Sequence, residues 1–197
     1  MDYKLGKTAA LAGFGGWTLL GILELISSWL FNLHGQAIGT ILAVIYMLCT
    51  LAAAAGFAIM FLNRKNKLDL SIASNLVIYA LIAFLSNSYI WRLLFSIGIP
   101  AGLLQFFFSG TAFKLVGFFA AAFAGSWAAK FLNKQPIVAM LLGASAAWSL
   151  IYHLFLYDRI YMLNVQSYGG YSALMIVLSL VSIGCHAIYT FAAYAEE

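Results

Sequence analysis

A single carboxylic acid lies within a long apolar stretch near the N-terminus. Residues 19–30 read LLGILELISSWL, and Glu24 is the only charged residue among them. A charge at the centre of a bilayer costs at least about 2.5–3.5 kcal/mol, so such residues face the bundle interior, pair with another group or mark a solute or proton pathway. If this stretch spans a membrane, Glu24 marks a polar centre within the protein.

A lysine in a later apolar stretch could partner this acid. Lys114 belongs to a row of small residues at three- and four-residue steps, and a similar row precedes Glu24. The two rows are Gly110, Gly117, Ala121, Gly125 and Ala128, and Ala9, Gly13, Gly16 and Gly21. Such faces let helix backbones approach closely. We therefore expect the two faces to pack together and to bring Glu24 near Lys114, either as a structural ion pair or as part of a ligand site.

Two further stretches carry hydroxyl and imidazole groups in helical register. Ser145, Ser149 and His153 follow one another at four-residue spacing. A second row contains Ser172, Ser179, Ser182, His186 and Thr190. Each row forms one polar helix face, which can hydrogen-bond to another helix or line a water-accessible cavity. The candidate substrate-binding residues are therefore Glu24, Lys114, Ser145, Ser149, His153 and His186.

Metal binding and redox chemistry find little support in the pattern. His34, His153 and His186 contain no close pair such as HxxxH, whereas haem or zinc requires several converging ligands. Cys49 and Cys185 both lie in apolar runs, where they fit as small core residues. There is no phosphate-binding loop or Cys-x-x-Cys motif. We expect no metal ion and no cofactor.

Two short motifs resemble those of the rhomboid intramembrane proteases. Trp91-Arg92 resembles the Trp-Arg loop of that family, and Gly143-Ala144-Ser145-Ala146 resembles its Gly-x-Ser-Gly nucleophile motif. The resemblance implies a hydrolase in which Ser145 is the nucleophile and His186, on the last span, is its base. Ala146 stands where the family has glycine, and two spans precede Trp91 instead of one. An intramembrane hydrolase is therefore the less favoured alternative.

The amino-acid composition indicates that these residues belong to a membrane protein. Of the 197 residues, 64% are hydrophobic and 8% are charged, whereas a soluble domain carries about 25% charged residues. A helix needs about 20 residues to span a bilayer. We expect an all-α membrane bundle of about six spans, formed by residues 1–197 as a single domain. The net charge of +4 comes from residues that flank the spans and does not indicate nucleic-acid binding.

The limits of the spans follow from breaks in the apolar runs. The predicted spans are 8–31, 37–62, one from about 70, one ending at 132, 137–157 and 171–194. Gly98 and Pro100 can close one helix near 98 and open the next near 100. Alternatively, 93–108 is a re-entrant or interfacial piece and the fourth span covers 111–132.

The charges of the loops predict how the protein is oriented in the membrane. Seven basic residues lie on one side of the predicted spans, namely Lys4, Lys7, Arg64, Lys65, Lys67, Lys130 and Lys134. Only Arg92 and Arg159 lie near the other side. Because basic loops stay in the cytoplasm, both termini are expected there, in a multi-pass protein of the cell's inner membrane. Tyr152 and Tyr157 belong to a tyrosine cluster expected to form an aromatic belt at the outer interface.

The pattern as a whole favours a protein that binds or transports a small solute. In size and layout the chain resembles the substrate-binding subunits of energy-coupling-factor vitamin transporters, whose first helix has a small-residue face for docking. That resemblance implies a small-molecule ligand and a partner membrane protein, docked through the Gly/Ala faces of the first and fourth spans. A structural or accessory subunit of a larger membrane complex is the alternative.

Overall fold

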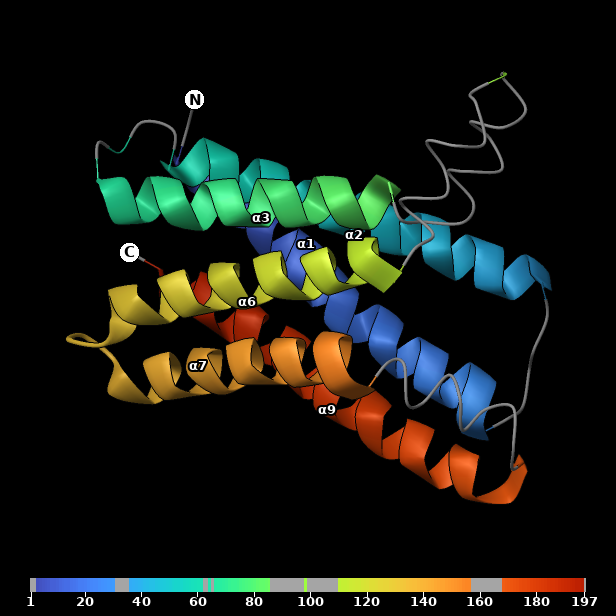
Figure 1. Ribbon diagram of the computed structural model, residues 1–197. Helices are drawn as coiled ribbons and strands as arrows, with labels where there is room; N and C mark the ends of the chain where they lie inside the picture. The colour runs from blue at the N-terminus through green and yellow to red at the C-terminus, as the bar shows by residue number, and fades with distance from the viewer. Residues whose placement is uncertain are drawn as a thin grey trace.

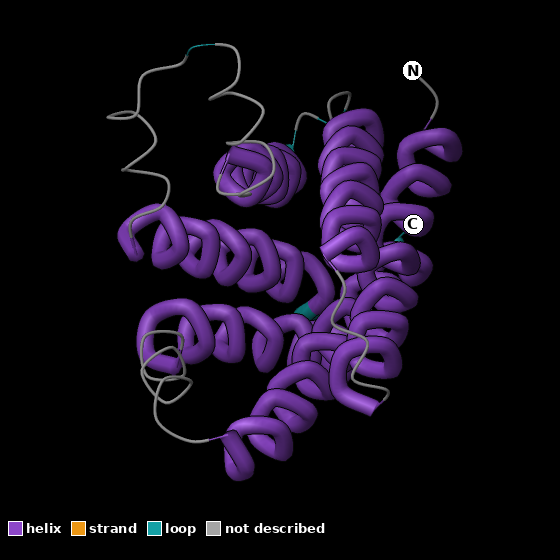
Figure 2. Tube along the Cα trace, turned by 90° about the vertical axis from the view of Figure 1, so that its right-hand side faces the viewer, coloured by secondary structure: helices purple, strands orange, loops and turns teal. Residues whose placement is uncertain are grey.

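The structure, a computed structural model, describes residues 3–30, 36–61, 64, 66–85, 98, 110–156 and 168–196. These residues form helices and connecting turns and contain no strand (Figure 1, Figure 2). Six of the helices are long and apolar enough to cross a membrane. The predicted all-α membrane bundle of about six spans is therefore confirmed.

The helix limits agree closely with the predicted spans. The elements are α1 (Tyr3–Glu24) with its π-helical continuation η1 (Leu25–Leu30), α2 (Gln36–Phe61), α3 (Lys67–Leu85), α6 (Gly110–Phe131), α7 (Pro136–Ile151) with its π-helical continuation η2 (Tyr152–Leu156), and α9 (Tyr168–Ala195). The start of α6 fits the prediction that placed the fourth span at 111–132. The 93–108 segment lies outside the described residues apart from Gly98.

Local sequence signals explain several of these limits. The Asn66 side chain accepts a hydrogen bond of 3.0 Å from the Leu68 amide at the start of α3, which is the role of an N-cap residue. In the turn between α6 and α7, the backbone amides of Lys134 and Gln135 both donate hydrogen bonds to the Phe131 carbonyl. Pro136 then opens α7, where its missing N–H costs nothing.

The six helices pack as a closed ring in chain order. Each helix contacts the next, from α1 to α2, α3, α6, α7 and α9, and α9 returns to pack against α1 (Figure 1). Both termini lie at the same end of this bundle, at the left of Figure 1. The contact of the Lys7 ammonium with the Glu196 carbonyl joins them. We call this the terminal end and the opposite one the distal end.

Aromatic side chains fill the centre of the helix bundle toward the terminal end. Phe14 on α1 lies at the hub of this core, which also includes Phe57, Phe123, Trp127 and Tyr189. Ring centroids of these four residues lie 5.5–6.1 Å from that of Phe14. All five side chains are at most 5% exposed. Such ring pairs add dispersion and edge-to-face attraction, which matter in lipid because helix association gains no hydrophobic driving force there.

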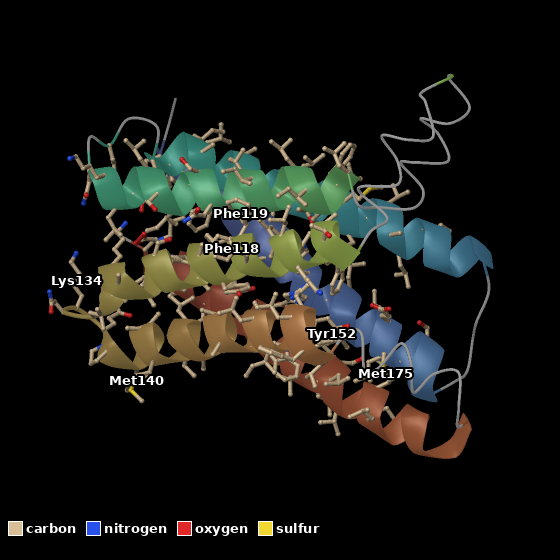
Figure 3. All side chains as sticks on the ribbon, in the orientation of Figure 1. Phe118, Phe119, Lys134, Met140, Tyr152 and Met175 are labelled. Atoms are coloured by element: carbon tan, nitrogen blue, oxygen red, sulfur yellow. The ribbon has the colours of Figure 1, made fainter. Side chains whose placement is uncertain are left out.

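The outer surface of the bundle is apolar. Large aliphatic side chains such as Met140 on α7 and Leu19 on α1 are 74% and 64% exposed. Figure 3 shows Met140 pointing away from the bundle. Exposed residues of this kind on every spanning helix are what contact with lipid tails requires.

The predicted packing of the two small-residue faces on each other is wrong. Gly13 and Gly16 of α1 pack against α2, where a Cβ on Gly13 would lie 2.4 Å from the Ala53 amide nitrogen, and Gly21 packs against Ile183 of α9. On α6, a Cβ on Gly117 would meet the His153 side chain, and one on Gly125 would meet nothing within 4 Å. Both rows allowed close approach equally well, but α2 presents its own small residues to α1. The α1 face is thus covered within the chain, and the docking of a partner protein through it stays a prediction.

Candidate functional site

A cavity of about 340 Å³ lies inside the ring of helices, distal to the aromatic core. Every spanning helix contributes to its wall. The residues that line it are Trp17, Glu24, Tyr46, Tyr79, Ala120, Phe123, Trp148, Ser149, Tyr152, His153, Ser182, Cys185, His186 and Tyr189. Its volume is at the lower end of the range of about 300–1,000 Å³ found for small-molecule sites, which are concave and mainly apolar with a few polar groups.

The cavity brings together most of the polar residues that the sequence singled out. Glu24, Ser149, His153 and His186 all line it, from α1, α7, η2 and α9. Lys114 does not belong to the lining and is exposed on α6. The acid thus reaches the polar centre expected of it, whereas the lysine proposed as its partner lies elsewhere on the bundle.

Glu24 lies at the point where an α-helix becomes a π-helix. It is the last residue of α1, and the chain continues from it as the π-helical segment η1. On the other side of the cavity, α7 changes in the same way at Tyr152, so His153 lies in η2. A π-helical turn widens the helix and changes the direction of its side chains, and such turns occur frequently at functional sites. Here two of them adjoin the same cavity.

A second hollow of about 200 Å³ adjoins the cavity between α1 and α9. The two hollows share Glu24, Tyr152, Ser182 and His186. The second continues toward the start of α9, where Met175 lines it. Figure 3 shows Tyr152 and Met175 on the side of the bundle away from Lys134, which lies at the terminal end. Glu24 is therefore located where the cavity leads toward the distal end.

The imidazole of His153 has a defined hydrogen-bonding state. Its Nδ1 lies 2.8 Å from the Ser149 carbonyl oxygen. A carbonyl can only accept, so Nδ1 carries the proton and the neutral ring keeps Nε2 as an acceptor. The ring is also held against Phe113, with centroids 4.5 Å apart. His153 therefore adds an acceptor to the lining.

Aromatic and hydroxyl groups from α1, α2 and α3 form the opposite part of the wall. Trp17 stacks on Tyr46 with centroids 5.7 Å apart, and its indole N–H donates to Thr50 Oγ1 over 3.1 Å. The hydroxyls of Tyr46 and Tyr79 lie 3.2 Å apart. Trp17 also contacts the His186 ring, at 5.3 Å between centroids. The sequence analysis missed Tyr46 and Tyr79 because each is a lone tyrosine in an apolar span, and no spacing signal connects them.

Ser145 lies one helical turn from Ser149 but outside the lining. It is 1% exposed, its hydroxyl donates to the Leu141 carbonyl over 3.1 Å, and it adjoins Cys185. The Nδ1 atom of His186 is buried and has no hydrogen-bond partner among the described residues. The serine hydroxyl and that histidine nitrogen therefore do not form the hydrogen-bonded pair that a nucleophile and its base require.

A buried network of charged residues lies at the terminal end. Asp69 and Glu196 are each 2% exposed, and both pair with the Lys130 ammonium. Arg64 lies 3.8 Å from Asp69. The sequence did not predict this network because Asp69 follows a loop and Glu196 follows the last helix, far apart in the sequence and at positions where charges usually stay in water. The available signal was that Asp69 falls within the first turn of an apolar helix.

Several candidate residues lie outside the described part of the chain. These are His34, Trp91, Arg92, Tyr157 and Arg159. The rhomboid-like Trp-Arg pair and the position of His34 therefore stay untested. Among the described residues, no group of three His, Cys, Asp or Glu side chains could hold a metal ion.

The fold and its apolar surface define the class of the protein as a multi-pass helical membrane protein. Comparison adds no closer relationship, since no family model, curated protein or solved structure matches the chain.

Proposed function

We propose that this membrane protein binds a small solute in the cavity next to Glu24. The observation that carries the proposal is the cavity itself, a space of about 340 Å³ with one carboxylate, two imidazoles and several hydroxyls set among aromatic rings. Polar groups are costly within a membrane and are found where they line a solute or ion pathway. A purely structural bundle would instead fill this space with side chains, as the aromatic core around Phe14 does.

The arrangement favours entry from the distal end. The second hollow leads from Glu24 toward that end, whereas the aromatic core lies between the cavity and the Lys130 network at the terminal end. The proposal extends to transport if the terminal half opens in another state of the protein. With both termini in the cytoplasm, as the basic loops favour, the solute would enter from outside the inner membrane.

Native mass spectrometry tests this proposal. Protein gently extracted from its source membrane should carry a small non-covalent adduct on the 21.5 kDa chain. The variant Ala120→Phe places a ring in the cavity and should lose the adduct, because Ala120 lines the wall. Ala129→Phe makes the same change at an exposed position of α6 outside the lining and should keep it.

The opposite results are equally informative. An adduct that survives in Ala120→Phe, with the thermal unfolding midpoint unchanged, would place the ligand elsewhere. A wild-type chain that carries a partner protein and no small adduct would overturn solute binding and favour the accessory-subunit alternative.

A further inference from the structure

The charged and aromatic residues that line the cavity indicate which class of solute it would bind. Of the described residues that form the wall, one is a carboxylic acid, Glu24, and none is a lysine or arginine. Lys114 on α6 does not belong to the lining, and the basic network around Lys130 lies at the terminal end, paired with Asp69 and Glu196. Among the described lining residues, Glu24 is therefore the only carboxylate, lysine or arginine, and a carboxylate attracts positive charge.

Aromatic rings line the same cavity as this acid. Each of the six spanning helices contributes at least one ring to the wall: Trp17, Tyr46, Tyr79, Phe123, Trp148 with Tyr152, and Tyr189. The negative face of an aromatic ring attracts cations, most strongly for tryptophan, and a shell of rings is a common means of binding an organic ammonium. An anion would face these rings and the carboxylate without a fixed positive charge from the described lining.

The hydrogen-bonding groups of the wall agree with this preference. The Nε2 atom of His153 is left as an acceptor because its Nδ1–H is bound to the Ser149 carbonyl. The Glu24 carboxylate accepts as well. A ligand that donates N–H or O–H groups therefore finds partners here.

From these observations, which rest on the proposed solute-binding function, we infer that the ligand is a small organic cation of the ammonium class, held by Glu24 within the shell of aromatic rings. The carboxylate provides the countercharge, and the rings replace part of the ligand's hydration. The cavity volume restricts the ligand to a small molecule.

Three probes of nearly the same shape and different charge test the inference. They are choline, its uncharged carbon analogue 3,3-dimethylbutan-1-ol, and the anion 3,3-dimethylbutanoate. Binding is measured by isothermal titration calorimetry on the full chain in lipid nanodiscs. Choline should bind at least about tenfold more tightly than the alcohol, and the anion should bind most weakly.

Variants of two lining residues separate charge from shape. Glu24→Gln should reduce the preference for choline over the alcohol to about twofold or less, whereas Glu24→Asp should keep most of it. Trp148 is the second lining residue to be varied, and its ring lies against that of Tyr152 with centroids 6.0 Å apart. Trp148→Leu should weaken choline binding, and Trp148→Phe should restore most of it, because phenylalanine keeps a ring.

Each contrary result has one interpretation. If the alcohol or the anion binds as tightly as choline, the cavity is a solute site without cation preference, and only this inference fails. If none of the probes binds while the native protein carries a small adduct, the inference fails and the proposed function stands. If none binds and no adduct is found, both fail.

Discussion

The Lys130 ammonium on α6 lies 2.9 Å from a carboxylate oxygen of Asp69 on α3 and also pairs with Glu196 at the end of the chain. The side chains of the two acids are 3% exposed, and that of Lys130 is 17% exposed. One cation thus pairs with two buried anions that lie far apart in the sequence. The network ties α3, α6 and the C-terminus together at the terminal end.

Removing the shared cation should destabilise the protein more than removing all three charges. Lys130→Met leaves two buried carboxylates without this partner and should lower the free energy of unfolding by about 3–5 kcal/mol. The triple variant Asp69→Asn, Lys130→Met, Glu196→Gln should recover much of that loss. Reversible unfolding in mixed micelles measures both values, and a triple variant less stable than Lys130→Met would contradict the assignment of the network.

The close approach of α1 and α2 should make one glycine far less tolerant than another. A Cβ at Gly13 would lie 2.4 Å from the Ala53 amide nitrogen and 2.6 Å from the Cys49 carbonyl oxygen, so Gly13→Ala forces two backbones apart. The expected cost is about 1–3 kcal/mol or more.

Gly125→Ala is the matched control for Gly13→Ala. It adds the same methyl group on α6, where nothing lies within 4 Å, and should leave the unfolding midpoint unchanged or slightly raised. Equal midpoints for the two variants would contradict the packing described for α1 and α2.

The orientation in the membrane is open to a direct chemical test. In a background where serine replaces Cys49 and Cys185, Lys134→Cys places a thiol at the terminal end and Gln36→Cys places one at the start of α2, at the distal end. A membrane-impermeant maleimide should label Lys134→Cys in inside-out vesicles and Gln36→Cys in right-side-out vesicles, because the basic loops favour cytoplasmic termini. The reverse pattern would place the termini outside.

A serine-reactive probe should distinguish the hydrolase alternative. Because Ser145 is buried and its hydroxyl is bound to the Leu141 carbonyl, a fluorophosphonate should not label the purified protein. Labelling that disappears in Ser145→Ala and persists in Ser149→Ala would overturn this expectation and restore the resemblance to rhomboid proteases as a functional one.

The spans could be predicted from the sequence because a bilayer leaves the chain few choices. Backbone groups in lipid must be satisfied within the segment, so an apolar run bounded by residues such as Asn66 and Pro136 becomes a helix with limits near those residues. Four of the six candidate residues line the cavity, namely Glu24, Ser149, His153 and His186, and the signal that pointed to them was a polar group in an otherwise apolar helix.

The partners of these residues could not be predicted in the same way. Two small-residue faces were available to α1, and the choice of α2 depends on side chains such as Cys49 and Ala53 that carry no special signal. Tyr46 and Tyr79 meet only because α2 and α3 are neighbours in the ring. Helix identity is thus a local property of the sequence, whereas helix pairing depends on the fit of whole surfaces.

The closed ring in chain order has a consequence for how the protein is made. Each helix that leaves the ribosome and enters the membrane finds its neighbour already in place, because α2 packs on α1, α3 on α2, and so on to α7. Among the described helices, only α9 must find two neighbours, α7 and α1. Its packing supplies Ser182, His186 and Tyr189 and brings Glu196 to Lys130. The wall of the cavity and the charge network at the terminal end are therefore completed when α9 packs in place.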